Sequence, residues 1–245
     1  MVPYGSTFKL SGMVLLLSAS NNFTHSITNI TFMKTTAKYF IIMSLMSNVA
    51  FAQENISIGP IVGVSIANLR GDIANNDWKA GLTAGGFFNY SSNSGLGVSG
   101  QVLFTQLGAQ INNKTDDIGL NYVQVPILLT YFLGQKGKSI RPKVFIGPHV
   151  NFLLSAKDRN GNDIAGETND PNYNSIDGGL TLGAGLNYRL NNKIWLNLDA
   201  RYGLGLADIT KSTANKLMNQ NFGINLGVSF PFGTYNERKG TIRTQ

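Results

Sequence analysis

The feature that most constrains the fold is a strict two-residue alternation of apolar and polar residues, which is clearest in residues 194–206, IWLNLDARYGLGL. One set of alternate positions carries Ile, Leu, Ala and Tyr, and the other carries Trp, Asn, Asp, Arg and Gly. Successive side chains of a β-strand point to opposite faces, so this period predicts a strand with one apolar and one polar face. The same alternation recurs in residues 176–190 and 222–232, so it characterises the chain and not one segment.

The alternating segments and their connections predict a barrel topology. The predicted strands are residues 56–67, 79–90, 95–110, 118–133, 140–155, 175–190, 193–208 and 219–232. Long connections alternate with short ones, which is typical of an up-and-down barrel with loops at one end and turns at the other. Each segment is long enough to cross a bilayer at a tilt, which takes about 9–11 residues.

The composition indicates which face of these strands meets lipid. Only 13% of the residues are charged, whereas a soluble domain usually carries about 25%. The polar face consists mainly of Gly, Ser and Asn, which suits a narrow interior better than a water-facing surface rich in Lys and Glu. We therefore predict an all-β fold, an eight-stranded antiparallel up-and-down transmembrane β-barrel with its apolar face in lipid. A soluble barrel with an apolar interior is the alternative.

Aromatic residues near the strand ends are consistent with the membrane barrel. Outer-membrane barrels carry aromatic girdles at both membrane interfaces. The predicted girdle at the turn end consists of Tyr90, Tyr131, Phe132, Tyr188, Trp195, Phe230 and Phe232. The predicted girdle at the loop end consists of Trp78, Tyr122, Phe152, Tyr202 and Phe222.

Residues 33–52 are predicted to be a secretory signal peptide. Lys34 and Lys38 form its positive segment, residues 39–46 its apolar segment, and Ala50-Phe51-Ala52 its cleavage motif. All three parts follow in the order that such a signal requires. The sequence therefore predicts an exported protein.

The remaining segments complete the predicted domain organisation. Residues 1–32 do not fit the signal and are predicted to be a disordered, over-extended start; residues 53–232 form the barrel and residues 233–245 a C-terminal tail. Cleavage before Gln53 removes three of the 20 basic residues and none of the 13 acidic residues, which leaves a net charge of +4. Such a mild charge argues against a nucleic-acid partner. The absence of cysteine excludes disulfides and a lipid-modified cysteine.

Several segments resemble the PorT-like outer-membrane β-barrel family of Bacteroidetes. The segment NYVQVPILLTYFL matches it through Tyr122, Pro126, Leu128, Leu129 and Tyr131. Further similarities are residues 58–69, 145–157 and 198–209, so that the likeness extends over residues 56–232. The resemblance implies a small eight-stranded outer-membrane barrel and no particular activity, although some relatives are linked to protein secretion. One departure is that Phe232, which resembles the terminal aromatic residue of such barrels, is followed here by further residues.

A group of charged side chains is predicted to point into the barrel lumen. Its members are Arg141, Lys143, Asp177, Arg189, Asp199 and Arg201. An eight-stranded barrel is just wide enough for side chains to fill, and unpaired buried charges are strongly unfavourable. We therefore predict a structural plug of paired side chains, with a narrow charge-lined conduit as the alternative.

No catalytic, cofactor-binding or metal-binding residue is assigned. His149 is predicted to be a hydrogen-bonded lumen residue, because no triad spacing accompanies it and no cysteine is available for a transition-metal site. Residues 158–163 lack the glycine and glutamate positions of a calcium loop, so Asn160-Gly161 is predicted to be a tight turn. Pro126 and Pro148 lie within predicted strands and are expected to mark bulges.

The sequence therefore predicts a non-enzymatic outer-membrane protein with a structural or interaction role, which the resemblance links to secretion or envelope integrity. Binding on such scaffolds is carried by loops, so loops 68–78 and 156–174 are the expected contact surfaces for a protein partner. Outer-membrane lipid and the barrel-assembly machinery are the other expected partners. The alternatives are a porin-like, narrow small-solute channel and a barrel enzyme that acts on lipid or peptide.

Overall fold

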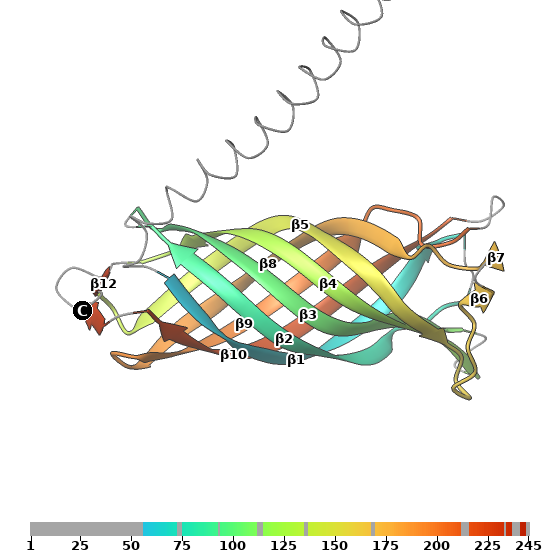
Figure 1. Cartoon of the computed structure of the whole chain (residues 1–245), viewed down its shortest axis with the longest axis horizontal. Helices are drawn as coiled ribbons and strands as arrows, with labels where there is room; N and C mark the ends of the chain where they lie inside the picture. The colour runs from blue at the N-terminus through green and yellow to red at the C-terminus, as the bar shows by residue number, and fades with distance from the viewer. Residues whose placement is uncertain are drawn as a thin grey trace, which may run out of the picture. The chain divides into compact units, whose positions relative to one another are not determined.

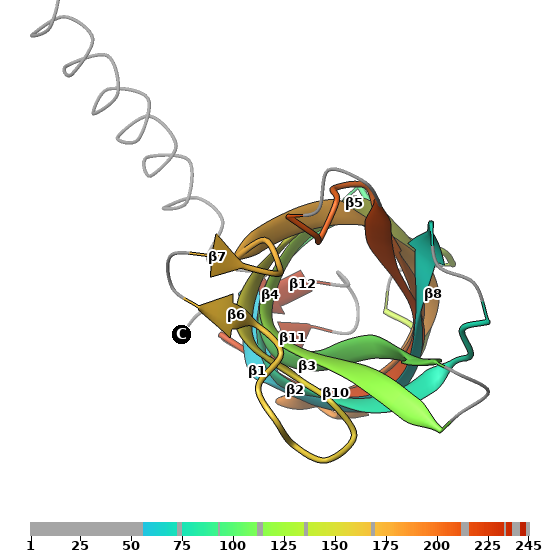
Figure 2. The same cartoon turned by 90° about the vertical axis from the view of Figure 1, so that its right-hand side faces the viewer.

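The computed structural model describes residues 56–72, 75–92, 94–111, 115–134, 137–167, 170–211, 216–232, 234–236 and 241–243. Within these ranges, eight long antiparallel strands close into a barrel in the order β1-β10-β9-β8-β5-β4-β3-β2 (Figures 1 and 2). The barrel strands are β1 (Ile56–Gly71), β2 (Lys79–Ser91), β3 (Leu96–Ile111), β4 (Asp116–Phe132), β5 (Ile140–Lys157), β8 (Ile176–Asn191), β9 (Ile194–Gly205) and β10 (Leu217–Pro231). The predicted fold class is confirmed.

Two short strand pairs lie outside the barrel sheet. The connection between β5 and β8 contains β6 (Gly166–Glu167) paired with β7 (Asp170–Pro171). After the barrel, β11 (Thr234–Asn236) pairs with β12 (Thr241–Arg243), within the stretch predicted to be a C-terminal tail. The predicted start segment 1–32 and signal peptide 33–52 lie outside the described residues. The described part of the chain contains no helix with the length and hydropathy of a membrane span.

The outer face of the barrel is apolar and the inner face is polar. Val64 exposes 60% of its surface and Leu82 59%, and both point outward from strands whose alternate residues point into the lumen. The buried side chains of the inner face include Asn225, Thr105 and Ser229. Since apolar side chains cover the outside, the barrel is built to stand in lipid, as the alternation predicts.

The predicted aromatic girdles are confirmed in part. Tyr131 and Tyr188 at the turn end, and Phe222 at the loop end, are exposed on the outer face. Tyr122 and Trp195, by contrast, are buried, and both point into the lumen. Their assignment to the girdles was wrong because closeness to a strand end does not determine on which face a side chain lies, whereas the alternation does.

The expected bulges at Pro126 and Pro148 are also wrong. Pro126 pairs with His149 and Pro148 with Leu180 in the same register as their neighbours. The pairing is instead interrupted locally, since β4 and β5 skip from the Pro126 pair to the pair of Leu129 with Ile146. A proline lacks the N–H that a ladder needs, and here the gap is absorbed without an extra residue.

Candidate functional site

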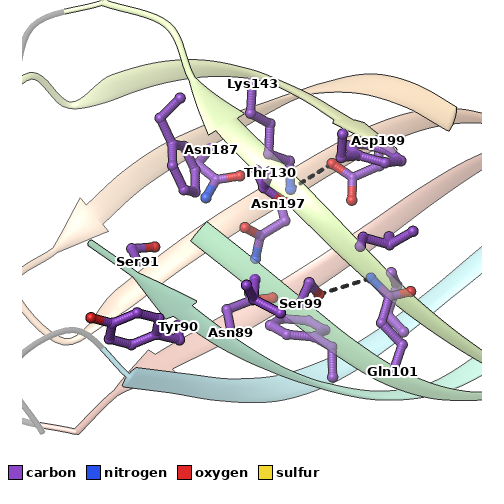
Figure 3. A pocket seen from close by; sticks show the side chains of 16 residues that line it. Asn89, Tyr90, Ser91, Ser99, Gln101, Thr130, Lys143, Asn187, Asn197 and Asp199 are labelled. Carbon is purple, nitrogen blue, oxygen red and sulfur yellow. Dashed lines mark hydrogen bonds and ion pairs between the residues drawn. The ribbon is translucent and has the colours of Figure 1, made fainter. Parts of the chain in front are cut away.

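Half of the predicted lumen charges form one contiguous network. Lys143 Nζ lies 2.8 Å from Asp199 Oδ1, and Arg201 Nη2 lies 3.6 Å from Asp199 Oδ2. Arg201 Nη1 donates a hydrogen bond of 3.0 Å to Gln101 Oε1, and Gln101 Nε2 donates one to Ser99 Oγ. Figure 3 shows Lys143 and Asp199 turned toward each other, and they flank Gly185 of the intervening strand β8. Two buried cations therefore share one carboxylate.

Glycines on the inner face make room for these side chains. A Cβ added at Gly185 would lie 2.6 Å from the carbonyl oxygen of Leu198 and 2.9 Å from Lys143 Cε. A Cβ added at Gly183 would lie 2.5 Å from Phe145 Cζ. All three distances are below 3.0 Å, so an added Cβ would force the neighbouring atoms to shift. The filled lumen therefore requires glycine at these positions of the inner face.

The network borders a small cavity in the turn half of the lumen, which polar and apolar side chains line together. Its lining includes the following polar side chains: Asn89, Ser99, Gln101, Thr130, Lys143, Asn187, Asn197 and Asp199 (Figure 3). The space open to the centre of a water molecule is about 20 Å³, which is enough for about one water. The buried Oδ1 atoms of Asn187 and Asn197 have no hydrogen-bond partner among the residues that the structure describes. The cavity is therefore suited to ordered water and is too narrow for a hydrated solute.

Asp177 belongs to a second, separate network that contains no cation. Its Oδ1 accepts a hydrogen bond of 2.6 Å from Asn151 Nδ2, and its Oδ2 accepts one of 3.2 Å from Asn219 Nδ2. Asn219 Nδ2 also lies 3.2 Å from Tyr122 Oη, and Gln124 Nε2 donates to Asn151 Oδ1. The amides of Asn151 and Asn219, together with the Tyr122 hydroxyl, thus satisfy this buried carboxylate.

The two remaining predicted lumen charges lie at the turn end. The guanidinium of Arg141 stacks 4.4 Å from the centre of the Phe132 ring. Arg189 donates from Nη1 to Asn192 Oδ1 at 3.3 Å and from Nη2 to Ser139 Oγ at 3.2 Å. The six predicted residues therefore occupy three levels of the barrel, and Lys143, Asp199 and Arg201 are joined by direct ion-pair contacts.

His149 and the Asp158 turn are placed as the sequence predicts. His149 is buried in mid-strand, with Nδ1 2.9 Å from Thr181 Oγ1. Asp158 closes the turn by accepting hydrogen bonds from the main chain and side chain of Asn162, and Gly161 has the positive φ that this turn requires. The Asn162 side chain, together with main-chain donors, holds the pKa of Asp158 below its usual range. The described residues contain no group of three or more His, Asp and Glu side chains arranged to hold a metal.

The loop end of the lumen is closed by an apolar cluster that the sequence analysis missed. Its buried members are Ala67, Leu69, Leu107, Ala109, Leu120, Tyr122, Ala156 and Ile209. Loop residues Ile164 and Tyr173, and Leu217 at the start of β10, pack against it. The available signal was the apolar residues on the inner face near the loop ends of strands, such as Leu69 and Leu107, which break the polar pattern of that face.

Two of the long loops above this cluster are hydrogen-bonded to each other. Asn174, before β8, donates from its main chain to the Ile209 carbonyl and from Nδ2 to the carbonyls of Asp208 and Thr210. Asp208 Oδ1 accepts from the N–H groups of Thr210 and Leu217. Burial acts to raise the pKa of Asp208, but these donors outweigh it and the pKa lies below its usual range. These hydrogen bonds tie the loop before β8 to the loop after β9.

A closed eight-stranded barrel with a lipid-facing apolar exterior and a filled lumen defines the class of small outer-membrane β-barrels. The sequence matches the profile of the outer membrane protein beta-barrel domain over residues 51–211. The chain therefore belongs to that family, and the protein resides in the outer membrane.

Several solved structures of outer-membrane proteins are similar to this chain. Neisserial surface protein A (NspA) is similar with a TM-score of 0.50 and 15% identity, over 72% of this chain and 97% of that chain. The Escherichia coli outer membrane protein W is similar with a TM-score of 0.45 and 14% identity, over 73% and 98%. Ail, the attachment invasion locus protein of Yersinia pestis, is similar with a TM-score of 0.41 and 15% identity in its complex with sucrose octasulfate, over 72% and 98%. No curated protein sequence matches the chain significantly.

Proposed function

We propose that this protein is a non-enzymatic, non-conducting component of the outer membrane that acts through its external loops. The observation that carries this proposal is the filling of the lumen at successive levels. Side chains around Asp199 occupy the turn half, the Asp177 network follows, and the apolar cluster around Leu120 closes the loop end. A solute would have to displace all three groups.

The external loops support an interaction role because they are tied together before any partner arrives. Asn174 links the loop between β5 and β8 to the loop between β9 and β10. A pre-organised surface loses less conformational entropy on binding than a mobile one. We propose loops 68–78 and 156–174 as the contact surfaces, and, from the likeness to PorT-like barrels, a role in secretion or envelope integrity.

Conductance across planar lipid bilayers tests the closed lumen. The purified wild-type barrel is expected to give no steady conductance above that of the lipid alone. Asp199→Asn in the lumen and Lys211→Gln on an exposed loop form a matched pair of charge-altering variants. A steady wild-type conductance that Asp199→Asn changes and Lys211→Gln leaves intact would establish the channel alternative and refute the proposal.

Complementation of a deletion strain tests the role of the loops. A variant with residues 158–165 replaced by Gly and Ser at constant length is expected to behave like the deletion in detergent sensitivity and protein export. His149→Ala is expected to complement fully, because we propose no catalytic step. Heat-dependent gel mobility confirms that each variant is folded. Full complementation by the loop replacement, or its loss in His149→Ala, would contradict the proposal.

A further inference from the structure

Two turns at the turn end of the barrel are held side by side. Because β5 pairs with β8, the β4–β5 turn lies next to the β8–β9 turn. Arg189 joins them, since its main-chain N–H donates to the Ser139 carbonyl at 2.7 Å and its guanidinium contacts Ser139 and Asn192. Lys138 and Lys193 are the chain neighbours of these two contact residues. The two lysines therefore lie on one side of the barrel rim, by which we mean the edge of the barrel at the turn end.

This side of the rim is basic, whereas the remaining short turn, between β2 and β3, is neutral. Lys138 and Lys193 are both exposed, and the described residues 137–143 and 188–194 include no Asp or Glu. In the β2–β3 turn, Ser92 Oγ and Ser94 Oγ lie 2.6 Å apart and no charged residue is present. Among the described parts of the three short turns, the positive charge thus lies in the β4–β5 and β8–β9 turns.

An apolar groove lies on the lipid-facing surface of the same strands. It has a volume of about 370 Å³, and the outward-pointing side chains that line it are Leu96, Leu129, Tyr131, Val144, Ile146 and Leu182. Val144 is four residues along β5 from Ile140, the first residue of the strand, which corresponds to about 13 Å at the rise of a strand. The groove therefore lies on the same strand as the turn, below it on the lipid-facing side. The exposed side chains of Leu133 and Ile140 continue the apolar surface up to the turns.

We propose that this side of the barrel binds an anionic phospholipid, with an acyl chain in the groove and the phosphate between Lys138 and Lys193. Short turns of outer-membrane barrels face the periplasm, so the site lies in the phospholipid leaflet. Basic side chains at headgroup level attract anionic lipids, and the exposed aromatic residues Tyr131 and Tyr188 fix the depth of the barrel. The site is separate from the external loops and does not depend on the proposed function.

Native mass spectrometry of the full chain, released from micelles containing equal phosphatidylglycerol and phosphatidylethanolamine, tests this site. The wild type is expected to retain phosphatidylglycerol preferentially. Lys138→Gln/Lys193→Gln is expected to lower that preference by about tenfold, because each lysine near an anionic headgroup contributes severalfold. Lys157→Gln/Lys211→Gln, an equal loss of exposed charge at the loop end, is expected to retain it.

A second variant tests the groove without changing charge. Leu182→Trp places a larger ring in the groove and is expected to reduce retention of phosphatidylglycerol while the rim lysines remain. Unchanged preference in the rim variant, or equal loss in the loop-end control, would overturn the proposal. Retention of an acidic peptide in place of phosphatidylglycerol, abolished in the rim variant, would assign the rim to a polypeptide partner and overturn it as well. Heat-dependent gel mobility verifies the fold of each variant.

Discussion

Replacing Asp199 by Asn removes the carboxylate that Lys143 and Arg201 share. Among the described side chains, no other carboxylate forms an ion pair with either cation, and Asp199 is only 4% exposed. Removing one partner of a buried ion pair costs about 3–5 kcal/mol, because the remaining charge is left uncompensated. Asparagine retains the size and one acceptor oxygen, so we expect a loss of about 3 kcal/mol, or about a hundredfold in the unfolding constant.

Urea titration in lipid vesicles, with the folded fraction read from heat-dependent gel mobility, measures this loss. Lys143→Met leaves Asp199 paired with Arg201 and is expected to cost about 1–2 kcal/mol. The double variant Lys143→Met/Asp199→Asn leaves Arg201 bonded to Gln101. Its loss of unfolding free energy is expected to be smaller than the sum of the two single losses, with a coupling energy of at least about 1 kcal/mol. A cost below about 0.5 kcal/mol for Asp199→Asn, or strictly additive effects, would show that water solvates the network and would refute the reasoning.

Three further results are expected from the structure. Gly185→Ala should lower the free energy of unfolding by about 1–3 kcal/mol through overpacking, whereas Gly100→Ala, where the added Cβ meets nothing within 4 Å, should be nearly neutral. Tyr122→Phe removes a hydrogen bond from Asp177 and one acceptor from the Asn219 amide, and it should cost about 1–2 kcal/mol in the same urea titration. Because the pKa of Asp208 is lowered on folding, its hydrogen bonds stabilise the loop above the unfolded pKa of about 3.9. That contribution should be lost as the pH falls through the lower folded value, which hydrogen exchange of the loop amides measures after correction for intrinsic rates.

Much of the scaffold could be predicted from the sequence because its signals are local. The alternation in residues 194–206 depends only on the opposite orientation of successive side chains, and it becomes β9 with Asp199 inward and Leu198 outward. The same rule placed His149 in the lumen. Prediction failed where local order does not determine the outcome, as for Tyr122, whose position near a strand end indicated an interfacial girdle.

The sequence by itself determined the barrel, its inverted polarity and the inward orientation of the charged residues, since each follows from a period of two and from composition. Only the tertiary structure decided which inward residues meet. Lys143 and Asp199 come from β5 and β9 and are brought together because the strand register sets Gly185 of β8 between them and that glycine leaves space for both side chains. Asp177 is held by amides instead, because the register sets Asn151 opposite it. The apolar closure at the loop end likewise required loop residues such as Ile209 to fold over the strands. Contacts between distant segments depend on strand register and closure, which no single segment of the sequence encodes.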